Sequence, residues 1–272
     1  MIQLGLIGHP LGHSLSPKIH TAALKASELE GGYSLFPIPP DDRQGLKDLL
    51  ARVRAGEIRG LNVTIPHKQN VIEFMDELTP TAKAIGAVNT IYMCADKLIG
   101  DNTDAPGFLS DLKRVSNSSF STPHSALVLG AGGSARAVVY ALLNDGWNVT
   151  LVARRIEQAQ QLTLSFTNQQ IQITDNSAFF IPHSSLIVNT TPLGMTPNTE
   201  TSPLPENTVL SKHTFIYDLV YNPRETKFVR DARAQGLNAS TGLGMLIEQA
   251  ALAFEKWTGV SADRVVMQQA VS

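Results

Sequence analysis

The sequence predicts an α/β fold with two domains, and three observations lead to this class. The chain has 272 residues, enough for two domains of about 100–200 residues each. Apolar segments typical of strands alternate with segments of helical period along nearly all of it. The most loop-like stretch, at 116–124, separates two such series. We therefore expect one α/β domain on each side of this stretch.

The composition is that of a globular protein with balanced charge. Hydrophobic residues make up 43% and charged residues 17%, and 22 Lys and Arg against 24 Asp and Glu give a net charge of −2. A nucleic-acid or membrane partner would need a basic patch, so we expect neither. Cys94 is the single cysteine, so no disulfide can form within the chain. The N-terminus lacks the features of a signal peptide, and no apolar run reaches the ~18 residues that a membrane-spanning helix needs. We therefore expect a cytoplasmic protein.

The first series begins with a short apolar strand over 2–8, which a glycine and a proline end. A helix follows over 17–26, with Ser16 as its expected N-cap and Pro17 at its first position. The alternation continues with strands over 33–38 and 58–65, helices over 39–53 and 67–78, and two segments flanking a turn near 95–97. These elements predict an α/β domain with a late hairpin.

The second series follows a helix over 108–115. It comprises strands over 125–130, 147–153, 184–191 and 214–220, and helices over 133–146, 155–166 and 224–236. A last helix over 244–259 has apolar residues on most faces, so it should be largely buried. Periodicity alone does not show which domain covers it.

A glycine-rich turn joins the strand over 125–130 to the helix that follows. It carries the pattern G-x-G-x-x-G/A, with Gly130, Gly132 and Ala135 at the three fixed positions. Here Gly130 permits a tight turn, Gly132 lets the backbone approach a pyrophosphate, and Ala135 allows close packing of helix on strand. The strand–turn–helix context favours a dinucleotide site over a tight connection without a ligand.

The end of the next strand indicates which dinucleotide is bound. An NAD site usually has an acidic residue there for the ribose 2′-hydroxyl. This strand instead ends in Ala153, Arg154 and Arg155. A guanidinium pairs with a 2′-phosphate, whereas a carboxylate repels it. We therefore expect NADP, the alternative being two arginines that only cover the start of a helix.

Several polar residues of the first domain lie at strand ends or in short loops. They are Ser14, Ser16, Asn62, Thr64, Lys68, Asn89, Asn102 and Asp104. Strand period two puts Asn62 and Thr64 on one face, and a buried unsatisfied polar group costs roughly 1–3 kcal/mol. These groups therefore bond either to the protein or to a ligand. As hydroxyls and amides with one amine and one carboxylate, they suit a small polyhydroxylated substrate that carries a carboxylate.

Two other kinds of site have no support. His67 stands alone, and the remaining histidines of the first domain are spread over a loop and a helix start, so we expect no metal. The G-x-S-x-G pattern is absent from the sequence, so acyl transfer is not expected.

Eight motifs cover nearly the whole chain. They are GHSLSPKIH (12–20), LNVTIPHK (61–68), IGAVNT (85–90), GDNTDAPGF (100–108), LGAGGSARA (129–137), NTTPLGM (189–195), DLVYNP (218–223) and GLGMLIEQAALAF (242–254). Together and in this order they resemble the shikimate dehydrogenase family.

The resemblance implies an α/β substrate-binding domain over 1–103 and 241–272, and a Rossmann-type NADP-binding domain over 104–240. The C-terminal helix would pack back on the first domain. The implied activity is the reversible NADP-linked reduction of 3-dehydroshikimate to shikimate, in the pathway to chorismate and the aromatic amino acids. The partner would be this small-molecule substrate. A homodimer is compatible with the sequence, which shows no subunit interface.

The resemblance also assigns the site residues. The substrate carboxylate would be held by Ser14 and Ser16 with help from Tyr221, and the ring hydroxyls and reacting oxygen by Asn62, Thr64, Asn89, Asp104 and Gln249. The cofactor would be held by Gly130, Ala131, Gly132, Gly133, Ser134, Ala135, Arg154, Arg155, Leu219 and Gly242. One departure concerns Ala153-Arg154-Arg155, where the family often has Asn-Arg-Thr, and it leaves the role of Arg155 open.

Our hypothesis for the chemistry is that Lys68 donates the proton to the reacting oxygen while Asp104 orients it. The alternative for Lys68 is a solvated lysine at a helix start. Two other functions remain open: a quinate/shikimate dehydrogenase that uses NAD, and a non-catalytic NADP-binding regulatory protein. The methylene-tetrahydrofolate dehydrogenase plan is also similar, but the motifs SLSP and GDNTD do not suit it.

Overall fold

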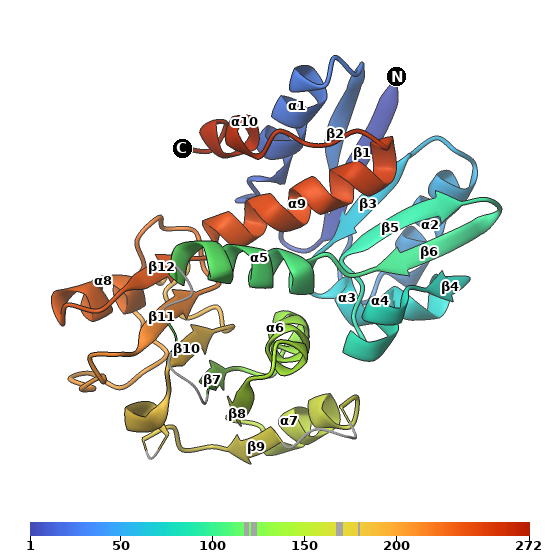
Figure 1. The fold of residues 1–272 in the computed structure, drawn as a ribbon. Helices are drawn as coiled ribbons and strands as arrows, with labels where there is room; N and C mark the ends of the chain where they lie inside the picture. The colour runs from blue at the N-terminus through green and yellow to red at the C-terminus, as the bar shows by residue number, and fades with distance from the viewer. Residues whose placement is uncertain (117–119, 121–123, 167–170, 179) are drawn as a thin grey trace. The chain divides into compact units, whose positions relative to one another are not determined.

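The chain folds into two compact α/β units, which confirms the predicted fold class (Figure 1). The computed structural model describes residues 1–116, 120, 124–166, 171–178 and 180–272. The first unit contains residues 1–107 and 247–272, and the second contains residues 108–246. Most of the loop-like stretch at 116–124 lies outside the described residues.

The first unit is built on a mixed sheet of six strands in the order β2-β1-β3-β5-β6-β4. Its elements are β1 (Ile2–Gly8), α1 (Ser16–Ala26), β2 (Gly31–Pro37), α2 (Arg43–Arg54), β3 (Gly60–Val63), α3 (His67–Asn70), a 3₁₀ turn (Ile72–Phe74), β4 (Glu77–Leu78), α4 (Pro80–Ile85), β5 (Thr90–Cys94) and β6 (Lys97–Asp101). Strand β1 pairs in parallel with β2 and β3, whereas β5 is antiparallel to β3 and β6. The β5–β6 pair is the hairpin expected from the sequence.

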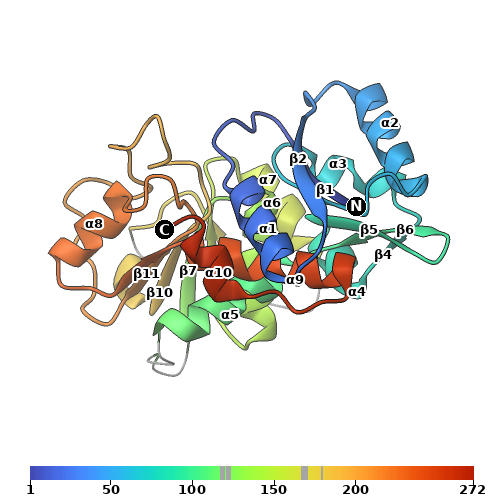
Figure 2. The ribbon, with the colours of Figure 1, turned by 90° about the horizontal axis from the view of Figure 1, so that it is seen from above.

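The two faces of this sheet are covered by helices from different parts of the chain (Figures 1 and 2). Helix α2 buries Leu46 and Leu50 against one face, together with Leu61 of β3. Helices α1, α9 (Leu243–Thr258) and α10 (Arg264–Gln269) lie on the other face. There the indole Nε1 of Trp257 donates to the carbonyl oxygen of Ile91 at 3.1 Å. The C-terminal segment is therefore an integral layer of the first unit.

The second unit is built on a fully parallel sheet in the order β12-β11-β10-β7-β8-β9. Its elements are α5 (Asp104–Ser116), whose first residues belong to the first unit, β7 (Ser125–Leu129), α6 (Gly133–Asn144), β8 (Asn148–Val152), α7 (Ile156–Thr163), β9 (Ile171–Thr174), a 3₁₀ turn (Ile181–His183), β10 (Leu186–Asn189), β11 (Phe215–Asp218), α8 (Lys227–Ala234) and β12 (Ala239–Thr241). Helices α6 and α7 lie on one face and α8 on the other (Figure 1). This is the strand order of dinucleotide-binding sheets, and it reverses between β7 and β10.

Two details expected from the sequence are wrong. The helix over 67–78 ends at Asn70, because Asp76 accepts from the backbone N–H of Leu98 at 2.7 Å and the next two residues pair with β6 as strand β4. Ser16 is the first helical residue of α1 rather than its cap, and its backbone N–H donates to the hydroxyl of Ser14 at 3.3 Å. At the first place tertiary pairing overrides the local pattern, whereas at the second a local hydrogen bond two residues back replaces the expected cap.

Candidate active site

The first unit contains a buried ion pair between Lys68, on the single turn of α3, and Asp104, the first residue of α5. The ammonium of Lys68 donates to Oδ2 of Asp104 at 2.6 Å, and the two side chains are 12% and 6% exposed. Most lysines are solvated. The burial and pairing of Lys68 argue against the alternative of a surface lysine.

Neighbouring groups hold Asp104 in place. Its other oxygen, Oδ1, accepts from Nδ2 of Asn89 at 2.9 Å. Its backbone N–H donates to the side chain of Asn102 at 3.1 Å, so the start of α5 is capped. Nδ2 of Asn89 also lies 3.2 Å from Oε1 of Gln249 on α9. Hydrogen bonds therefore join four side chains from distant parts of the chain: Lys68, Asn89, Asp104 and Gln249.

Asn62 is held from two sides. The hydroxyl of Tyr33 donates to its Oδ1 at 2.8 Å, and its Nδ2 donates to the backbone oxygen of Asn89 at 3.3 Å. A backbone carbonyl can only accept, so the amide nitrogen of Asn62 must face Asn89. Asn62 therefore has partners within the protein and a defined amide orientation.

The residue that fixes Tyr33 is His20, which the sequence did not point to. The two rings stack with centroids 4.5 Å apart and planes 2° from parallel. Burial lowers the pKa of His20 to about 3, and the side chain of Asn62 opposes this shift. The imidazole is therefore neutral at physiological pH. Tyr33 and Asn62 come together because β2 and β3 both pair with β1.

The remaining predicted substrate residues are divided between the two units. Ser14 and Thr64 are half-buried and Ser16 is buried, all in the first unit. Tyr221 is half-buried in the loop after β11 of the second unit, and burial raises the pKa of its hydroxyl.

The glycine-rich turn of the second unit lies at the point where the strand order reverses. Gly130 has a φ of +108°, and a Cβ on it would lie 2.6 Å from the hydroxyl of Thr190, which follows β10. Gly132 is the N-cap of α6, and the space where its Cβ would be is open. The first N–H groups of α6 therefore face an accessible turn, and Ala135 is fully buried behind it. This geometry fits a pyrophosphate.

Two exposed arginines follow the strand next to this turn. The register pairs Leu129 of β7 with Val152 of β8, and the backbone N–H of Gly130 donates to the oxygen of Val152 at 2.8 Å. Arg154 and Arg155 follow after Ala153, and both are exposed. A phosphate on the ribose of a bound dinucleotide would suit this position.

Backbone groups after β11 and β12 form another part of this edge. The N–H of Gly242 donates to the oxygen of Val220 at 3.3 Å. A Cβ on Gly242 would lie 2.3 Å from the oxygen of Leu219, so the chain approaches too closely for any side chain. Leu219 and Gly242, predicted as cofactor residues, therefore lie against each other.

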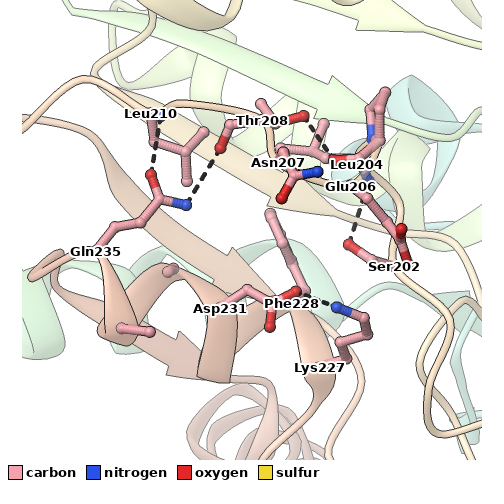
Figure 3. Close-up of a pocket in the computed structure, with 13 residues that line it drawn as sticks. Ser202, Leu204, Glu206, Asn207, Thr208, Leu210, Lys227, Phe228, Asp231 and Gln235 are labelled. Atoms are coloured by element: carbon pink, nitrogen blue, oxygen red, sulfur yellow. Dashed lines mark hydrogen bonds and ion pairs between the residues drawn. The ribbon is translucent and has the colours of Figure 1, made fainter.

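A pocket of about 390 Å³ between the segment 202–210 and α8 lies outside these two groups of residues (Figure 3). Several of its polar side chains have partners within the lining. Lys227 donates to Asp231 at 2.5 Å, and Gln235 bonds to the backbones of Leu210 and Thr208 at 3.2 Å each. We assign it no part in the candidate site.

Metal-binding clusters and membrane-spanning helices are both missing from the described residues. Within that part of the chain, no three His, Cys, Asp or Glu side chains gather in a way that could hold a metal ion. Each helix in the described ranges is too short or too polar to span a membrane.

Comparison with known proteins gives the family. A family model described as the shikimate dehydrogenase substrate binding domain matches residues 6–91, and one described as the shikimate 5′-dehydrogenase C-terminal domain matches residues 242–271. A protein of Carboxydothermus hydrogenoformans named shikimate dehydrogenase (NADP(+)) is 42% identical, over 98% of this chain and 95% of that protein. The chain belongs to the shikimate dehydrogenase family.

Solved structures of this family have the same fold. Shikimate 5-dehydrogenase from Thermus thermophilus, in complex with NADP(H) and shikimate, is 38% identical with a TM-score of 0.88, over 99% of this chain and 98% of that chain. Quinate dehydrogenase from Corynebacterium glutamicum, in complex with NAD, is 30% identical with a TM-score of 0.89, over 99% and 98%. The predicted family is confirmed, while the roles of individual residues stay predictions.

Proposed function

We propose that the chain catalyses the reversible NADP-linked reduction of 3-dehydroshikimate to shikimate, in the pathway to chorismate and the aromatic amino acids. The observation that carries this proposal is the buried Lys68–Asp104 pair, 2.6 Å apart, in a member of the shikimate dehydrogenase family. The arginines beside the glycine turn favour NADP over NAD. We place the reaction in the cytoplasm.

The chain's own part in the chemistry is proton transfer. NADPH, when bound, supplies the hydride to the C3 carbonyl carbon. Nζ of Lys68 donates a proton to the carbonyl oxygen, and in the reverse direction it takes the proton from the hydroxyl. Asp104 accepts from Nζ and so keeps the ammonium aimed, while Asn89 fixes the carboxylate. A proton donor placed in this way contributes ~10²–10⁴-fold to the rate.

The other residues bind and orient the substrate. We assign the substrate carboxylate to Ser14, Ser16 and Tyr221, and the ring hydroxyls and reacting oxygen to Asn62, Thr64, Asn89, Asp104 and Gln249. The domain that binds the substrate comprises 1–103 and 241–272. The convergence of amide groups around the buried ion pair supports this assignment.

The NADP-binding domain comprises 104–240. We assign the pyrophosphate to the turn at Gly130, Ala131, Gly132, Gly133, Ser134 and Ala135, the 2′-phosphate to Arg154 and Arg155, and the nicotinamide end to Leu219 and Gly242. The positive φ of Gly130 and the open space at Gly132 support the first assignment. The exposure of both arginines beside the turn supports the second.

A matrix of two cofactors and two substrates tests the proposed function. We expect kcat/KM to be highest for NADP⁺ with shikimate. It should be at least about tenfold lower with NAD⁺, because the lost charge-assisted bond contributes ~1.5–3 kcal/mol, and it should also be lower with quinate, whose ring has a different shape and an added hydroxyl. Absorbance at 340 nm measures all four rates. A preference for NAD⁺ and quinate would identify a quinate dehydrogenase instead. Cofactor binding without turnover would point to a regulatory protein.

The Tyr33–Asn62 bond gives a prediction about substrate binding. In Tyr33→Phe the ring remains stacked on His20, but Oδ1 of Asn62 loses this donor and the amide keeps its bond to the backbone of Asn89, so it is held less firmly. We expect KM for shikimate to rise about 3–10-fold with a smaller change in kcat, because one neutral hydrogen bond contributes ~0.5–1.5 kcal/mol. Steady-state kinetics measures both constants. Tyr140→Phe on α6 makes the same chemical change as a control, and an unchanged KM in Tyr33→Phe would contradict the prediction.

A further inference from the structure

A buried carboxylate at the end of β11 has no part in the mechanism above. Asp218 is the last residue of this strand, and its side chain is completely inaccessible to solvent. Its strand lies between β10 and β12, and its Cα pairs with Asn189 and Thr241. A buried carboxylate needs partners, and those found among the described residues are neutral donors.

Three hydrogen bonds hold the carboxylate, each from a different segment. Oδ1 accepts from Nδ2 of Asn189 at 2.8 Å and from the backbone N–H of Val220 at 3.0 Å. Oδ2 accepts from the hydroxyl of Thr226 at 2.7 Å. The side chain of Asp218 thus bonds to three segments: the end of β10, the loop after β11 and the start of α8.

The partners of Asp218 make further hydrogen bonds to the neighbouring loops. Asn189 uses its Oδ1 to accept from the backbone N–H and the hydroxyl of Thr191 at 3.0 and 2.7 Å, and its Nδ2 also reaches the oxygen of Leu193 at 3.2 Å. Thr226 caps α8 by accepting from the N–H of Val229 at 3.3 Å. The carboxylate therefore sets the shape of the loop over 190–193 as well as that over 219–221.

Both loops leave the carboxyl edge of the parallel sheet, where such sheets bind their ligands. The loop over 219–221 carries Leu219, assigned above to the nicotinamide end, and Val220, whose carbonyl accepts from Gly242. The loop over 190–193 begins with Thr190, next to Gly130 of the glycine turn. One buried side chain therefore links the two loops that border the proposed cofactor site.

The charge of this side chain depends on pH in an accessible range. Burial raises the pKa of Asp218 to about 6, while the bonds from Thr226, Val220 and Asn189 oppose the shift. Thr241 on β12 does not titrate, and burial raises the pKa values of Tyr217 and Tyr221, which stay neutral. Protonation makes one oxygen a donor and removes the charge, so the bonds from Asn189, Val220 and Thr226 lose the charge assistance that the carboxylate gives them.

We propose that Asp218 is a positioning residue for the cofactor, and that its ionised carboxylate holds the loops over 190–193 and 219–221 in the shape that receives the nicotinamide end. The inference rests on the proposed function, because Leu219 is assigned to the cofactor through it. Asp218 does not touch the reacting atoms.

The test compares NADP⁺ binding by the wild-type chain and by Asp218→Asn at pH 5 to 8, using isothermal titration calorimetry. Asparagine keeps the shape and can accept from Asn189 and Val220, so it resembles the acid form. We expect Kd of the variant to exceed that of the wild type about tenfold at pH 8, and this ratio to approach one at pH 5. Titration of the 2′-phosphate itself cancels in the ratio.

Two controls separate positioning from general damage. Asp231→Asn makes the same chemical change on α8, at a carboxylate paired with Lys227, and should leave Kd unchanged at every pH. If Asp218→Asn melts below the assay temperature, Thr226→Val replaces it. That variant removes the donor to Oδ2, so its NADP⁺ affinity should begin to fall at a higher pH than that of the wild type.

The outcome distinguishes this inference from the proposed function. A variant-to-wild-type ratio that is constant from pH 5 to 8, or a wild-type pH profile in Thr226→Val, would overturn the role of Asp218. If the wild-type chain turns over shikimate with NADP⁺ in the same buffers, the proposed function stands in either case. Failure of the wild-type chain to bind NADP⁺ would instead remove the proposed function.

Discussion

Lys68→Ala should lower kcat for shikimate oxidation by ~10²–10⁴-fold, the range that a positioned acid or base contributes. KM for shikimate should change little, because the serines, amides and Asp104 that bind the substrate remain. The side chain of Lys68 is only 12% exposed and its ammonium donates to Asp104, so alanine removes the proton donor from a largely buried position. Steady-state kinetics in both directions measures the effect.

The same substitution leaves a buried carboxylate without its cation. Breaking a buried ion pair costs about 3–5 kcal/mol of stability, and the bond from Asn89 to Asp104 compensates in part. The melting temperature must therefore be measured beside kcat, and assays run well below it. Lys83→Ala, at an exposed lysine of α4, is the control for a lost surface charge. A folded Lys68→Ala enzyme with kcat near that of the wild type would exclude Lys68 from the chemistry.

The second large effect concerns the choice of cofactor. Arg154→Ala should raise KM for NADP⁺ about 10–100-fold, because a hydrogen bond to a charged phosphate contributes ~1.5–3 kcal/mol. KM for NAD⁺ should stay within about twofold, since NAD⁺ lacks the phosphate that the guanidinium pairs with. Initial rates with each cofactor at saturating shikimate measure the change.

Arg155 provides an internal comparison for this prediction. It is the N-cap residue of α7, at the position where the family often has threonine. If only Arg154 binds the phosphate, Arg155→Ala should change KM for NADP⁺ by less than about twofold. If both arginines bind it, the two variants should have similar effects. Equal loss of NAD⁺ and NADP⁺ binding in Arg154→Ala would mean that the arginine supports the fold rather than the phosphate.

Local patterns predicted most of the elements that carry the proposed site. The glycine turn directly follows its strand, and the arginines come at the end of the next strand, so the local pattern indicates a dinucleotide site. The same holds for Asn62 and Lys68, which share one motif. The meeting of Lys68 with Asp104 was expected only from the resemblance, because 36 residues separate them in the chain.

Other features depend on contacts that no local pattern shows. Tyr33 reaches Asn62 because both of their strands pair with β1, and the imidazole of His20, on α1, is buried against Tyr33 of β2 and against α9. Asp218 resembles any acidic residue at a strand end until Asn189 and Thr226 are placed around it. The last helix, α10, and the short strands β9 and β12 were missed because their apolar periods are too short to detect.

The position of Trp257 has a consequence for the order in which the two units can fold during translation. Its indole lies on Gly60, where a Cβ would be 2.2 Å from the ring, and its carbonyl accepts from Arg59 at 2.8 Å. The ribosome makes residues 1–107 first and residues 247–272 last, yet both belong to one unit. The second unit, 108–246, is continuous and can close its sheet while synthesis goes on. The nascent first unit can cover the sheet face that contacts Trp257 with α1 alone, and the part that α9 and α10 cover stays exposed until those helices leave the exit tunnel.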